Sequence, residues 1–201
     1  MMVNGKVVAL ELKDLKNKSK RKNLFVLSGE RIKRLIIERE LLIKPYDKNA
    51  VGPCDINLRI SENYARIKNT RETLDLYDYK DEIIDEKYFI LERGKEYVIQ
   101  PNEHLLIESK EYLEMPNFLT GLIGLRSTFS RLGLSTPPTF IDPGFKGKIV
   151  LHLIGGSFPI KLHENMSVFK VIFMYVDSNN ESYNGKYQNQ KGIMLPKMDP
   201  S

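Results

Sequence analysis

The stretch RSTFSRLGLSTPPTFIDPGFKG contains the side chains best suited to chemistry on a phosphate. Arg126 and Arg131 supply planar guanidinium groups that can bind phosphate oxygens in pairs, and Ser127 and Thr128 add hydroxyl and backbone donors. Asp142 follows in an IDPGF turn, where a carboxylate could orient a water molecule or hold a metal. The alternative is a surface turn with a structural ion pair, because arginines near an acid are commonly structural.

The elements that must position these residues are mainly short strands. Runs typical of strands occur at residues 56–60, 88–91, 96–99, 104–108, 122–125, 148–154 and 168–176. Turn residues separate the runs, and no long helical pattern intervenes, which predicts a sandwich, barrel or jelly roll. A helix is expected near the N-terminus at about 29–39, with Ser28 as its N-cap, followed by a short strand that Pro45 ends.

Length and charge predict one domain with a basic extension. The chain has 201 residues, of which 41% are hydrophobic and 28% charged. Residues 1–22 carry seven basic and two acidic residues, which accounts for the whole net charge of +5. We therefore interpret residues 1–26 as a solvated extension that would touch nucleic acid only weakly. Residues 27–201 form the expected domain, with 67–87 as a loop or hairpin insertion.

Two further features bear on location. No apolar run approaches the ~20 residues needed to span a bilayer, so we expect no contact with a membrane. Cys54 is the single cysteine, which excludes an internal disulfide and fits a reducing compartment. Together these features predict a cytoplasmic protein.

Four motifs in order resemble the trimeric dUTPase and dCTP deaminase superfamily. The RST, RLG and IDPGF groups above form the core of the resemblance. Residues 27–45 resemble the N-terminal helix and strand of dCTP deaminases, 56–60 (INLRI) their first strand motif, and 185–192 (GKYQNQKG) their C-terminal segment. The resemblance implies a mainly β, distorted jelly-roll (β-clip) fold with a short N-terminal helix. It also implies a homotrimer with active sites between subunits.

The resemblance assigns the phosphate side of the site. The implied triphosphate-binding residues are Arg126, Ser127, Thr128, Arg131, Lys186 and Gln190. The last two belong to a segment expected to close over the nucleotide, although without the motif they would be an ordinary polar tail. In dUTPases the acid that matches Asp142 activates the water that attacks the α-phosphate. Mg²⁺ is expected to be held largely by the substrate, assisted by Asn57, which replaces the first-motif Asp of the family, or by Asp55.

The base and sugar side is assigned to Thr139, Ile141, Phe145 and His152. The loop LSTPPTFI before Asp142 has the length found in dUTPases. Phe145 stands where dUTPases have Tyr and deaminases Trp, and it is expected to stack near the deoxyribose. His152 stands where deaminases have the Glu that shuttles protons during deamination. A histidine could shuttle protons too, or it could be a structural residue on a partly buried strand.

These observations predict a Mg²⁺-dependent hydrolase of nucleotide metabolism, a dUTP diphosphatase that converts dUTP to dUMP and pyrophosphate. Two alternatives stay open. One is a dCTP deaminase, monofunctional or bifunctional, acting on dCTP. The other is a catalytically silent nucleotide-binding regulator, because Asn57 and His152 depart from the family pattern.

Overall fold

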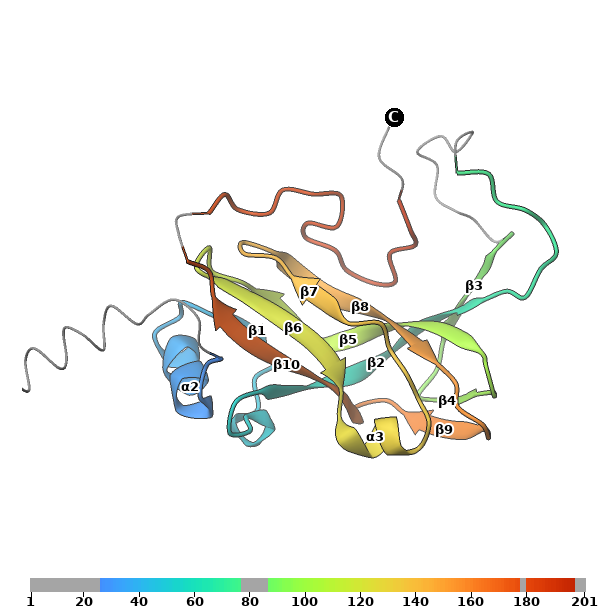
Figure 1. The fold of residues 1–201 in the computed structure, drawn as a ribbon, viewed down its shortest axis with the longest axis horizontal. Helices are drawn as coiled ribbons and strands as arrows, with labels where there is room; N and C mark the ends of the chain where they lie inside the picture. Colours follow the sequence, from blue (N-terminus) through green and yellow to red (C-terminus); the bar gives the residue numbers. More distant parts are fainter. Residues whose placement is uncertain (1–25, 77–86, 178–179, 198–201) are drawn as a thin grey trace, which may run out of the picture.

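The fold is mainly β, with one short helix near the N-terminus (Figure 1). The computed structural model describes residues 26–76, 87–177 and 180–197. Its elements are α2 (Gly29–Ile37), β1 (Leu42–Lys44), the 3-10 helix η1 (Lys48–Ala50), β2 (Ile56–Ile67), β3 (Phe89–Arg93), β4 (Glu96–Ile99), β5 (His104–Glu114), β6 (Leu119–Leu125), α3 (Ser127–Arg131), β7 (Thr139–Ile141), β8 (Lys146–Ile154), β9 (Ile160–His163) and β10 (Ser167–Tyr175).

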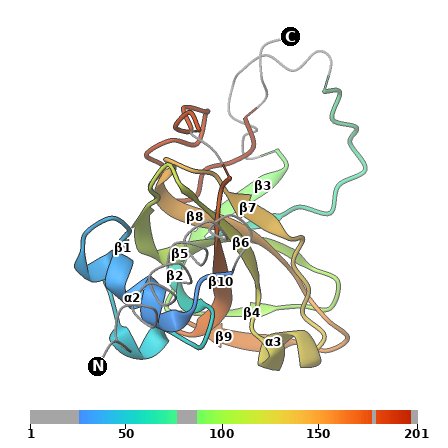
Figure 2. The same cartoon turned by 60° about the vertical axis from the view of Figure 1, so that its left-hand side comes forward.

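The long strand β2 joins the two halves of a curled sheet. Its first residues pair with β10, and its later residues pair with β5 and β3, always antiparallel. The strand order is β1-β5-β2-β10-β6-β7, with β3 added on β2 and β8 added on β5. Strands β4 and β9 form a separate two-stranded sheet. Figures 1 and 2 show the curl from two sides, and the fold is the distorted jelly roll that the sequence predicted.

Buried and partly exposed side chains alternate along the strands, so each strand turns one face to the core and presents the other outward. In β8, Ile149, Leu151 and Leu153 are buried in the main hydrophobic core. Between them, Val150 and His152 are only half-buried. Because successive side chains of a strand point to opposite faces, the core side fixes which residues β8 presents on its other face.

The helix and the predicted strands are confirmed with small shifts in their bounds. Helix α2 begins after Ser28, whose Oγ accepts a hydrogen bond from the Arg31 amide at 3.3 Å, as an N-cap should. The helix ends at Ile37, two residues before the predicted end, and Arg39 then adopts a left-handed φ of 60°. All seven predicted runs form strands, and β7 and β9 are additional.

Two sequence predictions fall partly outside the described residues. The basic extension covers 1–26, of which only Val26 is described, and Val26 pairs with Met174. The division at residue 26 therefore stays a prediction. Of the expected insertion at 67–87, residues 68–76 contain no helix or strand. Among the helices that the structure describes, none is long and apolar enough to cross a membrane.

Candidate functional site

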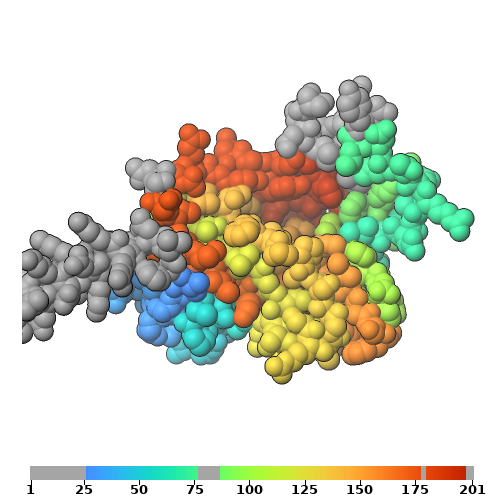
Figure 3. Space-filling model, viewed as in Figure 1, coloured from blue at the N-terminus to red at the C-terminus, as the bar shows by residue number. Residues whose placement is uncertain are grey.

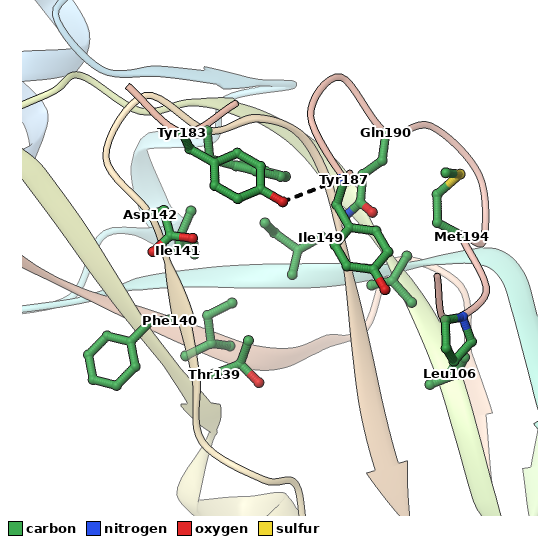
Figure 4. Close-up of a pocket in the computed structure, with 14 residues that line it drawn as sticks. Leu106, Thr139, Phe140, Ile141, Asp142, Ile149, Tyr183, Tyr187, Gln190 and Met194 are labelled. Atoms are coloured by element: carbon green, nitrogen blue, oxygen red, sulfur yellow. Dashed lines mark hydrogen bonds between the residues drawn. The ribbon is translucent and has the colours of Figure 1, made fainter. Parts of the chain in front are cut away.

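A cavity of about 300 Å³ lies between β7 and β8, on the side covered by the C-terminal segment, residues 180–197 (Figure 4). β7 and the turn after it contribute Thr139, Asp142 and Phe145 to its wall, and the C-terminal segment contributes Tyr183 and Gln190 among others. The lining is largely apolar with a few polar groups, which is typical of a small-molecule site.

A tight turn presents Asp142 at this cavity. The Phe145 amide donates to the Asp142 carbonyl at 3.1 Å, and Gly144 supplies the left-handed φ of 79° that the turn requires. The Asp142 side chain is exposed, and none of the described residues forms a hydrogen bond or ion pair with its carboxylate. The carboxylate is therefore available to a ligand or a water molecule.

Two aromatic rings form one wall of the cavity. Phe145 is buried, and its ring lies 5.9 Å from that of Tyr183 at an angle of 55°. The Tyr183 hydroxyl accepts a hydrogen bond from the Tyr187 amide at 3.2 Å, the contact dashed in Figure 4. The wall thus combines the turn after β7 with the C-terminal segment. Sequence reasoning identified Phe145 as a site residue. It included Tyr187 in the C-terminal motif at 185–192 without giving it a role, and it missed Tyr183, which lies in irregular structure outside that motif.

The C-terminal segment is docked along β8. The Lys148 amide donates to the Gln190 carbonyl at 3.1 Å, and Gln190 Nε2 donates to the Lys148 carbonyl at 2.5 Å. Gln190 is only 9% exposed, so its side-chain amide holds the segment in place as well as facing the cavity. Lys186 is exposed and does not line the cavity.

The four phosphate-binding candidates of the RST and RLG groups gather on α3 and its N-cap. Arg126 precedes the helix, and its Nη1 donates to the Ser167 carbonyl at 2.8 Å. Ser127, Thr128 and Arg131 are exposed on the helix. In both Figure 1 and Figure 2, α3 and the turn after β7 lie at opposite edges of the β-structure. A single chain therefore does not bring this cluster to Asp142.

The metal-ligand candidates also lie away from the cavity. Asp55 forms an ion pair with Lys170, with Oδ2 and Nζ 3.5 Å apart, and Asn57 pairs with Lys170 in the sheet. Neither Asp55 nor Asn57 lines the Asp142 cavity. In the part of the chain that the structure describes, no three His, Cys, Asp or Glu side chains form a group that could hold a metal.

His152 lies beside a second histidine that sequence reasoning missed. His104 Nδ1 and His152 Nε2 are 2.8 Å apart, and the two rings stack with centroids 5.0 Å apart. Burial, and then the neighbouring His104, lower the pKa of His152 below 6.5. His152 pairs across the sheet with Leu106, which lines the cavity, although His152 itself does not. Only the register of β5 against β8 brings the two histidines together.

The other two base-side candidates differ in exposure. Thr139 is exposed and lines the cavity. Ile141 also borders the cavity but is buried in the core, and its carbonyl accepts a hydrogen bond from Thr120 Oγ1 at 3.0 Å. Because the side chain of Ile141 is aliphatic, its contact with a ligand in the cavity would be apolar.

Comparison with known proteins identifies the family. A model of the dCTP deaminase-like family matches residues 26–176, which include most of the cavity and all of α3. The chain belongs to this family. A dCTP deaminase of Ignicoccus hospitalis is 41% identical over 180 residues, covering 87% of this chain and 98% of the relative. A "Probable deoxyuridine 5'-triphosphate nucleotidohydrolase" of Sulfolobus islandicus rod-shaped virus 1 is 36% identical over 176 residues, covering 87% and 100%.

A solved structure supports the fold assignment. The 2'-deoxycytidine 5'-triphosphate deaminase of Agrobacterium tumefaciens superposes with a TM-score of 0.60 at 16% identity. The match covers 77% of this dCTP deaminase-like chain and spans half the length of the Agrobacterium chain. At this identity the likeness concerns the fold and not the reaction.

Proposed function

We propose that the protein is a dUTP diphosphatase, which hydrolyses dUTP to dUMP and pyrophosphate. The observation that carries this proposal is the unpartnered carboxylate of Asp142 at the wall of the aromatic-lined cavity. The resemblance supports it further, because His152 stands where the deaminases have their catalytic Glu. The two reactions need different groups. Hydrolysis needs a base beside the α-phosphate, whereas deamination needs a proton shuttle at the base edge.

In the proposed complex the cavity takes the deoxynucleoside. Phe145 and Tyr183 pack against the sugar and base, and the backbone of the loop before Asp142 reads the edge of the uracil. The Asp142 carboxylate accepts a proton from a water molecule while the water oxygen attacks the α-phosphorus. The bond between the α-phosphorus and the bridging oxygen breaks, and pyrophosphate leaves with the electron pair.

The triphosphate would be bound by a neighbouring subunit. Because α3 lies at the edge opposite the turn after β7, and none of its phosphate-binding candidates lines the cavity, the Arg126 cluster of one chain would serve the cavity of another. A guanidinium group and hydroxyl donors there would offset the negative charge of the phosphates. We therefore propose that each site combines two chains, within the homotrimer that the resemblance implies.

The oxygen ligands on the cavity wall fit Mg²⁺ only if the substrate carries the ion into the site. Mg²⁺ commonly binds one or two carboxylates together with phosphate oxygens and waters. Asp142 is the one carboxylate on the cavity wall within the described residues, and Asp55 is already paired with Lys170. Mg²⁺ would neutralise charge on the phosphate oxygens, and the rest of the site would come from the chain itself.

A dCTP deaminase is the second candidate, and the names of the relatives favour it. The Ignicoccus protein, at 41% identity, carries that name, whereas the viral protein at 36% carries the other. The His104–His152 pair gives this candidate a chemical basis. A neutral imidazole with a hydrogen-bonded partner can take a proton from water and return it to a leaving amine.

The reaction products distinguish the two candidates. The purified protein is incubated with Mg²⁺ and either dUTP or dCTP, and the products are separated by chromatography. Release of dUMP and pyrophosphate from dUTP, with dCTP intact, supports the diphosphatase. Ammonia released from dCTP, and lost in His152→Ala, supports the deaminase. Binding of dUTP without any turnover would overturn both and favour a regulator.

Subunit mixing tests the shared site. Arg131→Ala and Asp142→Asn each remove one half of the proposed site, so each protein alone should be inactive. Random mixing of the two should restore about one quarter of the sites, because such a site takes its halves from two chains. A mixture as inactive as the separate variants, despite proven subunit exchange, contradicts the two-chain site.

A further inference from the structure

A buried carboxylate lies beside the C-terminal segment and takes no part in the proposed reaction. Glu108 of β5 is only 1% exposed. Its oxygens accept hydrogen bonds from Ser61 Oγ (2.7 Å), Asn63 Nδ2 (2.9 Å), Lys148 Nζ (3.0 Å) and the Gly192 amide (2.6 Å). Burial opposes the charge, but the three side-chain donors lower the pKa of Glu108 overall, so the group is ionised at neutral pH.

Three of the four donors belong to strands, and only the Gly192 amide belongs to the C-terminal segment. The strand donors stabilise the charge within the fold. Their geometry leaves Glu108 Oε1 directed at Gly192, which adopts a left-handed φ of 75°. The carboxylate therefore connects the interior of the sheet to a segment that contains no helix or strand over residues 180–197.

Gly192 lies between two parts of the cavity wall. Before it, Gln190 runs beside β8 and lines the cavity. After it, Met194 and Pro196 line the same cavity, while Leu195 is buried in a second, smaller hydrophobic cluster. Figure 3 shows this segment, in red, lying across the gold and orange strands β7 and β8. Since the segment has no regular structure, contacts of this kind determine its path.

We propose that Glu108 is a positioning residue that anchors the C-terminal segment over the Asp142 cavity and so sets the affinity for the nucleotide. This inference rests on the proposed function, in which the cavity binds the nucleoside. Hydrogen bonds to a charged acceptor are among the stronger ones in proteins. Loss of the anchor should raise KM for dUTP on the order of 10-fold to 100-fold. The kcat should change less, because Glu108 does not touch the reacting atoms.

The test compares Glu108→Gln with Glu111→Gln in the full-length protein. Glu111 is a matched control: it lies on the same strand, is 4% exposed and accepts hydrogen bonds from Arg59. No described residue of the C-terminal segment forms a hydrogen bond or ion pair with its carboxylate. Amide hydrogen exchange by mass spectrometry is followed over residues 186–197. We expect loss of protection there in Glu108→Gln and wild-type protection in Glu111→Gln.

A second variant removes the other partner of the bond. An ester in place of the Lys191–Gly192 amide, introduced by joining a synthetic C-terminal peptide to the rest of the chain, deletes the donating N–H and keeps glycine at its left-handed φ of 75°. It leaves the buried carboxylate unaltered, so it answers the question even if Glu108→Gln fails to fold. Protection and KM that match the wild type in either folded variant would overturn the anchor. Hydrogen exchange requires no turnover, so the two proposals fail separately. A protein inactive on dUTP refutes the proposed function, while selective loss of protection still supports the anchor.

Discussion

Asp142→Asn should abolish most of the proposed activity while leaving the stability of the fold unchanged. The side chain is exposed, and within the described residues its carboxylate makes no hydrogen bond or ion pair that an amide would lose. The free energy of unfolding should therefore stay within about 0.5 kcal/mol of the wild type, as for most surface substitutions. The turn survives too, because it depends on the Asp142 carbonyl and on Gly144.

Activity should respond very differently. An amide cannot accept the proton of the attacking water, and loss of a general base typically costs about 10²- to 10⁴-fold in rate. This loss corresponds to about 2.7 to 5.5 kcal/mol in the activation barrier. KM should not rise, since the substitution removes a negative charge near a polyphosphate. Pyrophosphate release from dUTP with Mg²⁺ measures kcat and KM, and thermal unfolding measures stability.

Asp47→Asn is the matched control. Asp47 is likewise exposed, and its Oδ1 accepts a hydrogen bond from the Asn49 amide at 2.8 Å, which the Asn side chain can replace. It lies at η1, outside the cavity, so its variant should keep the wild-type rate. If Asp142→Asn also stays within about threefold of the wild-type kcat, the carboxylate is not the base and the proposed mechanism is wrong.

Three further variants probe neighbouring features. Because the pKa of Glu108 is lowered, its ionisation stabilises the fold above about pH 4.5, and this stability is lost as the pH falls through the folded-state pKa. Acid unfolding of Glu108→Gln should therefore depend less on pH below 4.5. His104→Ala should raise the pKa of His152, followed by NMR titration, and an unchanged value would show that burial alone lowers it. Gly144→Ala would place a Cβ 2.7 Å from the Ser182 Cβ at positive φ, so thermal unfolding should reveal about 1 kcal/mol or more of destabilisation.

The strands could be predicted from the sequence where apolar side chains recur along the run. The run at 56–60 marks the start of β2, but the strand continues to Ile67 through Ser61 and Asn63. These polar residues do not read as strand in isolation. They fit because Glu108, on the neighbouring strand, accepts hydrogen bonds from both. A polar residue inside a strand can be assigned only when its partner is known, and the sequence does not show the partner.

The candidate site was predictable one motif at a time, but its assembly was not. Asp142 and Phe145 lie close together in the sequence and in the cavity. Gln190 reaches the same cavity only because the segment docks along β8, a tertiary contact without a local signal. Arg126 is nearer to Asp142 in sequence than Gln190 is, yet α3 lies at the opposite edge. Motif order therefore predicts which residues belong to the candidate site, but not whether a single chain brings them together.

The outward face of β8 explains why membership of the family leaves the reaction open. Lys148, Val150 and His152 follow each other at every second position, spaced about 6.6 Å apart. Lys148 bonds to Glu108, Val150 lines the cavity, and His152 meets His104. Each side chain has separate partners, so residue 152 can change without disturbing the anchor or the cavity. A scaffold arranged in this way can keep the proposed nucleotide site while its proton chemistry changes at one position, which is why 41% identity to a protein named dCTP deaminase does not decide the reaction.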